Sequence, residues 1–280
     1  MEIARKEDKM NGLMVGENEI FHNVKERKYP NGLRKITVAS KNVYKEKGWE
    51  LSANINQGEK QKISKPQNKD NAARSDSMRR AKQKVFDIAA MNSFDYFITL
   101  TLDEKKIDRY DVPQVMQKLK TFLRNNVSRH NLKYLILPEK HKDGAIHMHG
   151  LISGNMQFVD SGTVEAAGFS KPVKLETALQ KNIPASEIHT VYNMPQWTLG
   201  FSTAIATYGD TVNCAKYITK YVTKDVQKIF GNFYYAGGDI IRDVPYSLYD
   251  LNYDEVESDK EIYCEAISTY FKFLNEQEVV

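Results

Sequence analysis

Residues 94–103, with the sequence FDYFITLTLD, restrict the fold more than any other stretch of this 280-residue chain. One face of an extended strand would carry apolar side chains, namely Tyr96, Ile98, Leu100 and Leu102. The other face would carry Phe97, Thr99, Thr101 and Asp103. Alternation with a period of two predicts a β-strand that places one face in the core and leaves a mixed aromatic and hydroxyl face outside it.

A second pair of predicted strands brings two histidines toward one carboxylate. Residues 133–139 and 146–152 are rich in apolar residues, and a Lys-Asp-Gly turn signal lies between them. Side chains two positions apart on a strand share a face, so we expect His147 and His149 to point the same way. In a hairpin with an odd number of turn residues, Glu139 would share that face. Imidazole and carboxylate groups can hold a metal ion, and mixed nitrogen and oxygen ligation leaves the choice of ion open.

Helical patterns surround these strands. Residues 111–127 carry apolar side chains at helical spacing, with Asp111 as a candidate N-cap and a proline in the first turn. Residues 72–91 predict a helix with a basic first half, in which Arg79 and Arg80 could contact DNA or could simply be a solvated surface. A further helix is expected over 211–230, ended by a glycine.

Composition divides the chain into a structured middle and two unusual ends. Residues 1–71 are polar and end in a Lys-, Gln- and Asn-rich stretch that is typical of a linker. Residues 153–196 contain several Gly and Pro residues, which indicates an insertion with short helices. Residues 239–280 form an acidic tail, in which the capping-box pattern of Ser258 and Glu261 predicts a helix reaching Leu274.

The charge distribution favours a nucleic-acid partner. The net charge is +4, yet residues 239–280 hold eleven Asp or Glu against three Lys or Arg, so the remainder is a basic body. No run of about 18 apolar residues occurs, and the N-terminus lacks the apolar segment of a signal peptide, so we expect no membrane contact. Two cysteines make neither a disulfide framework nor a zinc quartet, which favours a reduced cytoplasmic setting.

A tyrosine-lysine pattern repeats within the expected helix over 211–230. The stretch KYITKYVTK contains Tyr-x-x-Lys twice, as Tyr217 with Lys220 and as Tyr221 with Lys224. Residues four apart on a helix project on the same side, so both phenols could reach one site. They lie on the flank of the predicted apolar stripe, a position where tyrosines more often serve packing. A phenol with a pKa of about 10 needs a nearby cation to attack at neutral pH.

Three short motifs together resemble those of the HUH endonucleases. In order they are Phe97-Ile98-Thr99-Leu100-Thr101, His147-Met148-His149 and the doubled Tyr-x-x-Lys. The likeness is closest to two-tyrosine rolling-circle replication initiator (Rep) proteins of plasmids, phages and related elements. It covers about residues 72–236, so residues 72–238 are assigned to an HUH endonuclease domain. Residues 1–71 and the 153–196 insertion have no counterpart in this pattern.

The resemblance implies an α+β, RRM-like fold. Its central antiparallel sheet has about five strands, with helices packed on one face and an open face that holds the site. By the same likeness His147 and His149 bind a divalent ion, Mg²⁺ or Mn²⁺, and an acidic residue of the preceding strand completes the ligand set. Glu139 is our choice for that residue.

The resemblance also implies a reaction. The ion polarises a scissile phosphate in single-stranded or locally melted origin DNA, and Tyr217 or Tyr221 attacks it. The products are a 5′-phosphotyrosyl link and a free 3′-hydroxyl that primes synthesis, and the strand is later rejoined. Lys220 and Lys224 would steady the developing charge. The candidate DNA contacts are Phe97, Thr99, Thr101, Arg79 and Arg80.

Partners and alternatives follow from the same residues. The chain has no Gly-x-x-x-x-Gly-Lys-Ser/Thr stretch, so unwinding is expected from a host helicase and copying from a host DNA polymerase. A single-tyrosine transposase or relaxase-like strand transferase stays open, although relaxases place their tyrosine before the histidines. A non-catalytic protein that binds single-stranded nucleic acid also stays open. A zinc hydrolase would leave the paired Tyr-x-x-Lys unexplained.

Overall fold

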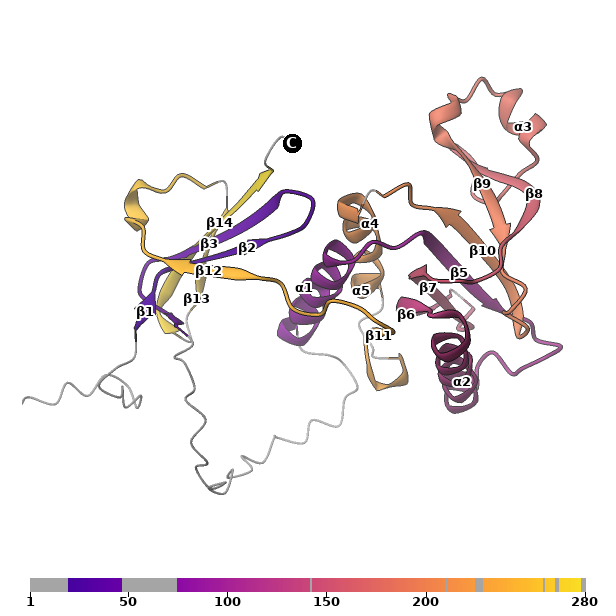
Figure 1. Cartoon of the computed structure of the whole chain (residues 1–280), viewed down its shortest axis with the longest axis horizontal. Coiled ribbons are helices and arrows are strands. Elements are labelled where there is room, and N and C mark those ends of the chain that lie inside the picture. The colour runs from indigo at the N-terminus through magenta and orange to yellow at the C-terminus, as the bar shows by residue number, and fades with distance from the viewer. Residues whose placement is uncertain are drawn as a thin grey trace, which may run out of the picture. The chain divides into compact units, whose positions relative to one another are not determined.

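The chain folds into two compact units (Figure 1). The computed structural model describes residues 20–46, 75–141, 143–209, 211–224, 229–258, 260–264 and 267–277. One unit takes the described parts of residues 1–65 and 245–280, and the other takes those of residues 66–244. Opposite ends of the chain therefore share one unit, whereas the sequence suggested a separate extension and a separate tail. The expected linker over 58–70 lies outside the described residues.

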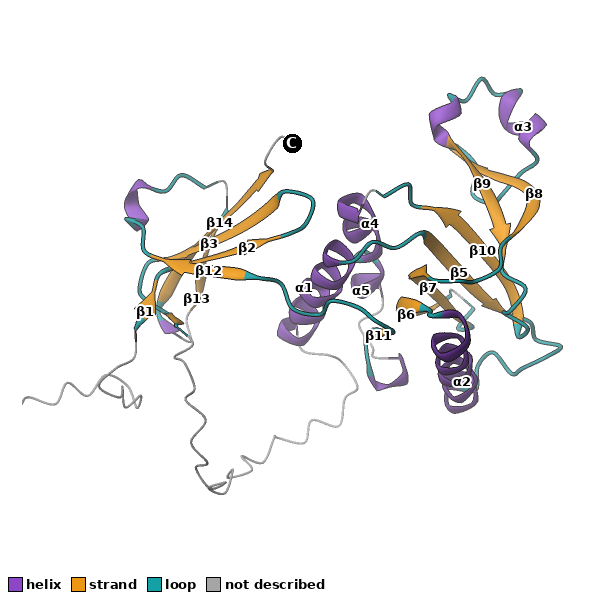
Figure 2. Cartoon of the chain, in the orientation of Figure 1, coloured by secondary structure: helices purple, strands orange, loops and turns teal. Residues whose placement is uncertain are grey.

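The larger unit contains a seven-stranded antiparallel sheet in the order β11-β6-β7-β5-β10-β9-β8 (Figure 2). Its strands are β5 (Tyr96–Leu102), β6 (Lys133–Lys140), β7 (Ile146–Ser153), β8 (Val159–Ala166), β9 (Ile188–Asn193), β10 (Gly200–Ala206) and β11 (Tyr235–Gly237). The predicted α+β class with a central antiparallel sheet is confirmed. The two strands beyond the expected five are β8 and β9, because the 153–196 insertion adds an antiparallel pair beside β10.

Helices cover both faces of this sheet, whereas the sequence predicted helices on one face. The helical segments of the two units are α1 (Ser75–Met91), α2 (Val112–His130), α3 (Leu175–Leu179), α4 (Thr211–Ile218), α5 (Tyr221–Lys224), η1 (Ala185–Glu187), η2 (Ile229–Gly231) and η3 (Tyr253–Glu255). α2 lies on one face, and α1, α4 and α5 contact β6 and β7 from the other. Among the described residues no helix is both long and apolar enough to cross a membrane.

The packing of α2 explains why one face of β5 is apolar. Leu119 and Leu123 of α2 share a buried core with Ile98 and Leu100 of β5. The predicted N-cap is confirmed, since the Asp111 carboxylate accepts a hydrogen bond from the backbone N–H of the third helical residue at 3.0 Å. This side of the sheet is therefore committed to the core, and only the other side can carry polar chemistry.

The helix expected over 211–230 is interrupted. α4 ends at Ile218 and α5 begins at Tyr221, and residues 225–228 lie outside the described part. The Thr219 hydroxyl donates to the carbonyl of Lys216 at 2.8 Å, and a hydroxyl bonded in this way competes with the backbone for a helical acceptor. Because the interruption precedes Tyr221, the two tyrosines belong to successive helices.

The smaller unit contains a five-stranded antiparallel sheet in the order β12-β2-β3-β14-β13. Its strands are β2 (Val24–Lys28), β3 (Leu33–Ala39), β12 (Tyr246–Tyr249), β13 (Glu261–Cys264) and β14 (Thr269–Gln277), and a separate ribbon pairs β1 (Phe21–His22) with β4 (Tyr44–Lys45). The helix predicted over 258–274 is instead β13 and β14. β14 pairs with β3 on one side and β13 on the other, and its aromatic, β-branched start suits a strand.

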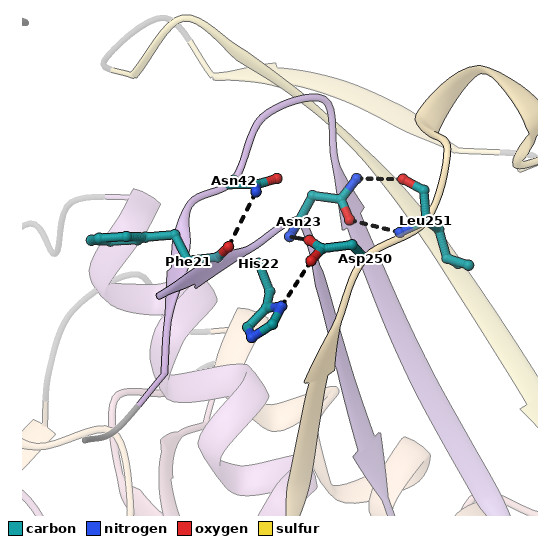
Figure 3. A network of polar contacts seen from close by, with 6 residues as sticks. All are labelled: Phe21, His22, Asn23, Asn42, Asp250 and Leu251. Carbon is teal, nitrogen blue, oxygen red and sulfur yellow. Dashed lines mark hydrogen bonds and ion pairs between the residues drawn. The ribbon is translucent and has the colours of Figure 1, made fainter. Parts of the chain in front are cut away.

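A polar network fastens the two chain ends within the smaller unit (Figure 3). The buried Asn23 side chain exchanges two hydrogen bonds with the backbone of Leu251, at 2.7 and 2.9 Å. The Asp250 carboxylate accepts from the backbone N–H of Asn23 at 2.9 Å and lies 3.0 Å from the His22 ring. The Asn23 N–H, followed by His22, lowers the pKa of Asp250, so this carboxylate stays charged at neutral pH. β1 and β2 are thereby joined to the segment after β12.

Candidate active site

Strand register places the two motif histidines beside the hydroxyl face of β5. His147 lies opposite Thr101, and His149 lies opposite Thr99. Directly paired residues of antiparallel strands share a face. The intervening Met148 is fully buried in the opposite direction, against the α2 core. The polar face of β5 and β7 is thus continuous across both strands.

Glu139 joins this face from β6. It lies opposite His147 in the strand register, and its carboxylate oxygen Oε2 is 3.0 Å from Nε2 of His149. The other ring nitrogen of His149, Nδ1, is 3.1 Å from the Thr99 hydroxyl. The His149 ring is therefore oriented from both sides, by a carboxylate and by a hydroxyl.

A third histidine, which the sequence motifs did not mark, neighbours His147. The rings of His141 and His147 stack with centroids 5.0 Å apart. Burial lowers the pKa of His147, and the nearby His141 and His149 lower it further. A neutral imidazole is the form that binds metal ions. Pairing the two sides of the predicted hairpin would have brought His141 to notice, since it follows β6 directly.

The donor set fits a divalent cation in its chemistry. His147, His149 and Glu139 offer two imidazoles and one carboxylate from adjacent strands on one sheet face. Thr99 supports His149 in the way that outer hydrogen bonds orient metal-binding imidazoles. Of these three side chains, His149 and Glu139 are in direct contact. Within the described residues no three His, Cys, Asp or Glu side chains are already gathered as a metal cluster.

The tyrosine pair lies against His149. The Tyr221 ring stacks on the His149 ring with centroids 4.1 Å apart and planes 25° apart. The Tyr221 hydroxyl donates a hydrogen bond to the Tyr217 hydroxyl at 3.1 Å. Tyr221 is 8% exposed, whereas Tyr217 is 44% exposed. The structure therefore brings both predicted tyrosines to the histidine face and gives them different access to solvent.

The environment of Tyr221 keeps its hydroxyl protonated. Burial raises the pKa of Tyr221 well above its usual value, and the hydrogen bond with Tyr217 raises it further. The negative charges of Glu139 and of Glu165, from β8, act in the same direction. At neutral pH Tyr221 is a hydrogen-bond donor and not a phenolate.

Two aromatic residues of this face differ in exposure. Phe97 packs edge-on against Tyr217, with ring centroids 5.1 Å apart, and so supports the tyrosines. Phe201 of β10 lies opposite Thr101 and is 68% exposed. An exposed aromatic ring beside threonine hydroxyls can stack on a nucleobase. The sequence predicts a strand over 196–207, and the alternation of that strand is the signal that would have marked Phe201.

The basic residues predicted for the site have different positions. The Lys220 ammonium lies 5.2 Å from the centroid of the Tyr217 ring, a cation–π contact. The side chain of Lys224 lies outside the described residues. Arg79 and Arg80 are exposed on the first half of α1. Their contact with DNA stays a prediction.

The family comparison agrees with this part of the chain. Residues 95–226 match the model of a family described as Replication-associated protein, of the ORF2 type. The matched segment contains the strands of the histidine face and both tyrosines. The match supports a replication-associated protein of the Rep type. Comparisons with curated proteins and with solved structures gave no match.

Proposed function

We propose that this protein initiates rolling-circle replication by nicking single-stranded origin DNA through tyrosine attack, as a two-tyrosine HUH endonuclease. The stack of Tyr221 on His149 carries the proposal, because it joins a phenol pair to an imidazole and carboxylate pair. A packing role alone would not require a hydroxyl–hydroxyl contact beside paired histidines. The match to a replication-associated family supports the same function.

Tyr217 makes the first attack in this proposal. Its greater exposure allows a DNA strand to reach it without rearrangement of the helices. Tyr221 donates a hydrogen bond to the Tyr217 oxygen, and such a bond strengthens when its acceptor becomes charged. The Lys220 ammonium near the Tyr217 ring favours the same negative charge.

The strand-transfer step exchanges one phosphodiester bond for another. The phenolate oxygen of Tyr217 forms a bond to phosphorus, while the bond from phosphorus to the preceding 3′-oxygen breaks. Tyr217 gives its proton to solvent, and the leaving 3′-oxygen takes one from solvent. Attack of a 3′-hydroxyl on the phosphotyrosine runs the step backward and rejoins the strand. Because the two bonds are similar in energy, the enzyme can conserve the link without ATP.

His147, His149 and Glu139 would hold a Mg²⁺ or Mn²⁺ ion, which would supply Lewis-acid charge neutralisation at the phosphate. Thr99 fixes the orientation of His149 through its hydroxyl. The exposed Phe201 ring would stack on a base next to the scissile bond.

Tyr221 has two possible roles that lead to different functions. In the rolling-circle scheme it attacks the regenerated origin after one round of copying by a host polymerase, with a host helicase unwinding the duplex. Its burial favours a second candidate, a single-tyrosine strand transferase of the transposase or relaxase type, in which Tyr217 alone becomes linked to DNA.

The test is covalent capture of DNA. The full chain is incubated with pooled single-stranded origin fragments in Mn²⁺, in Mg²⁺ or in EDTA, and the products are separated on a denaturing gel. We expect a protein–DNA adduct with either metal and none in EDTA. The double variant Tyr217→Phe/Tyr221→Phe should form no adduct, whereas Tyr208→Phe, which alters a 76% exposed tyrosine, should behave as wild type.

Two outcomes count against the proposal. Metal-independent binding with no covalent product would identify a non-catalytic single-strand binder. An adduct that persists in the double variant would show that neither tyrosine is the nucleophile.

A further inference from the structure

The sheet of the smaller unit has one face that is both basic and aromatic. Strand register aligns Lys25 with Thr37, and Arg27 with Lys35, so these side chains share a face. The neighbouring strands add aromatic and apolar residues to it. Those residues are Tyr246 and Leu248 of β12, Phe271 and Phe273 of β14 and Ile262 of β13. We call this set, with the three basic residues, the basic sheet face.

Acidic residues are segregated to the opposite face. Glu26 lies on that side, opposite Ile36, and Glu261 lies there opposite Lys272. The same side holds the buried core of the unit, which Tyr253 and Val256 cover. Among the described strand residues of the basic sheet face there is no Asp or Glu. This unit takes in the acidic C-terminal segment, yet one of its faces is positive.

Cations and rings on the basic sheet face are already in contact. The Lys25 ammonium lies 4.1 Å from the centroid of the Tyr246 ring, and the Lys260 ammonium lies 5.7 Å from that of Phe273. Tyr246 is 37% exposed. Arg27 and the Thr37 side chain lie close to the hydroxyl of Tyr44, which adds a fourth ring at this face.

We propose that the basic sheet face binds single-stranded nucleic acid. Unpaired bases stack on aromatic side chains while Lys and Arg neutralise the adjoining phosphates, and an open sheet presents both kinds of group in rows. The absence of acidic residues from the described strand positions of this face matches a polyanion better than a protein surface of mixed charge. This site is separate from the tyrosine site and does not depend on the nicking reaction.

Binding of oligothymidylate to the full chain tests the proposal. A fluorescent strand of about 20 nucleotides is titrated in EDTA, so that no nicking occurs, and anisotropy is followed at several salt concentrations. We expect Lys25→Gln/Lys35→Gln to lower the salt slope by about 1.4, because each phosphate contact to a single strand contributes about 0.7. Phe273→Leu keeps apolar bulk but loses the aromatic ring, and should weaken binding by about five-fold or more.

Matched controls separate this face from general charge effects. Lys28→Gln/Lys41→Gln removes the same charge from the same unit, at exposed positions outside the basic sheet face, and should keep the wild-type affinity and slope. Duplex DNA should bind more weakly, because its bases are unavailable for stacking. A comparison of oligothymidylate with oligouridylate identifies DNA or RNA as the preferred strand.

The outcomes of this experiment are distinguishable from failure of the nuclease proposal. Loss of affinity with intact adduct formation on a short origin fragment supports the basic sheet face as a separate site. Unchanged affinity in both face variants, an equal loss in the control, or duplex bound as tightly as single strands would overturn it.

Discussion

Replacing Tyr221 with phenylalanine removes one hydroxyl and keeps the ring that stacks on His149. The rings lie 4.1 Å apart, so Tyr221→Phe leaves this aromatic packing in place. What disappears is the 3.1 Å hydrogen bond to the hydroxyl of Tyr217. Because burial raises the pKa of Tyr221, that hydroxyl holds its proton at neutral pH and serves as the donor to the attacking oxygen.

The size of the effect follows from the strength of that bond. A hydrogen bond to a charged oxygen contributes about 1.5–3 kcal/mol, which corresponds to about 10- to 100-fold in rate. We expect Tyr221→Phe to slow the first strand transfer by this factor. The deficit should narrow as the pH rises, because more Tyr217 is then deprotonated without the help of the donor. The free energy of unfolding should change by about 1 kcal/mol or less.

Single-turnover adduct formation, quenched at intervals and measured across neutral and alkaline pH, checks this prediction. Tyr217→Phe should abolish the first transfer at every pH, and Tyr208→Phe should leave its rate unchanged. The reasoning is refuted if Tyr221→Phe abolishes the adduct while Tyr217→Phe forms it at the wild-type rate, because the roles of the two tyrosines would then be reversed.

Three further perturbations test other parts of the account. Thr99→Val removes the hydroxyl at 3.1 Å from His149 without a change in size; activity in a Mn²⁺ titration should fall about 10- to 100-fold, with an unchanged melting temperature. Phe201→Ala removes a 68% exposed ring; single-strand affinity should fall by about 1–3 kcal/mol in an anisotropy titration, and unchanged affinity would exclude stacking there. The hydrogen bond from Arg34 lowers the pKa of Glu26, so its contribution to stability is present above the ordinary value of 4.5 and is lost as the pH falls through the lowered pKa. Thermal unfolding of the smaller unit should therefore weaken in acid, and the acid sensitivity should be smaller in Glu26→Gln.

Much of the candidate site was predictable because it depends on strand periodicity. A period of two fixes which side chains share a face, so the common face of Thr99, His147 and His149 follows from the sequence alone. The position of Glu139 needed only an odd turn, and the structure pairs it with His147 across the hairpin. The contact between Glu139 and His149 is a further detail of side-chain geometry that the register does not specify.

Other features depend on contacts that no local pattern reveals. β14 became a strand because it pairs with β3, which lies more than 200 residues earlier, and so its capping-box pattern was overridden. The break before Tyr221 follows from a single hydroxyl, that of Thr219, which bonds a helical carbonyl. The partners of β8 and β9 likewise required the register of β10, which also exposes Phe201.

The most direct measurement is the identity of the residue that becomes linked to DNA. Wild-type protein is reacted with a single-stranded origin fragment and Mn²⁺, the adduct is digested with protease and nuclease, and the modified peptide is sequenced by mass spectrometry. The account predicts a phosphonucleotide on Tyr217 after the first transfer, and no adduct from Tyr217→Phe under the same conditions. A linkage found first on Tyr221, or on any residue outside the tyrosine pair, would contradict it.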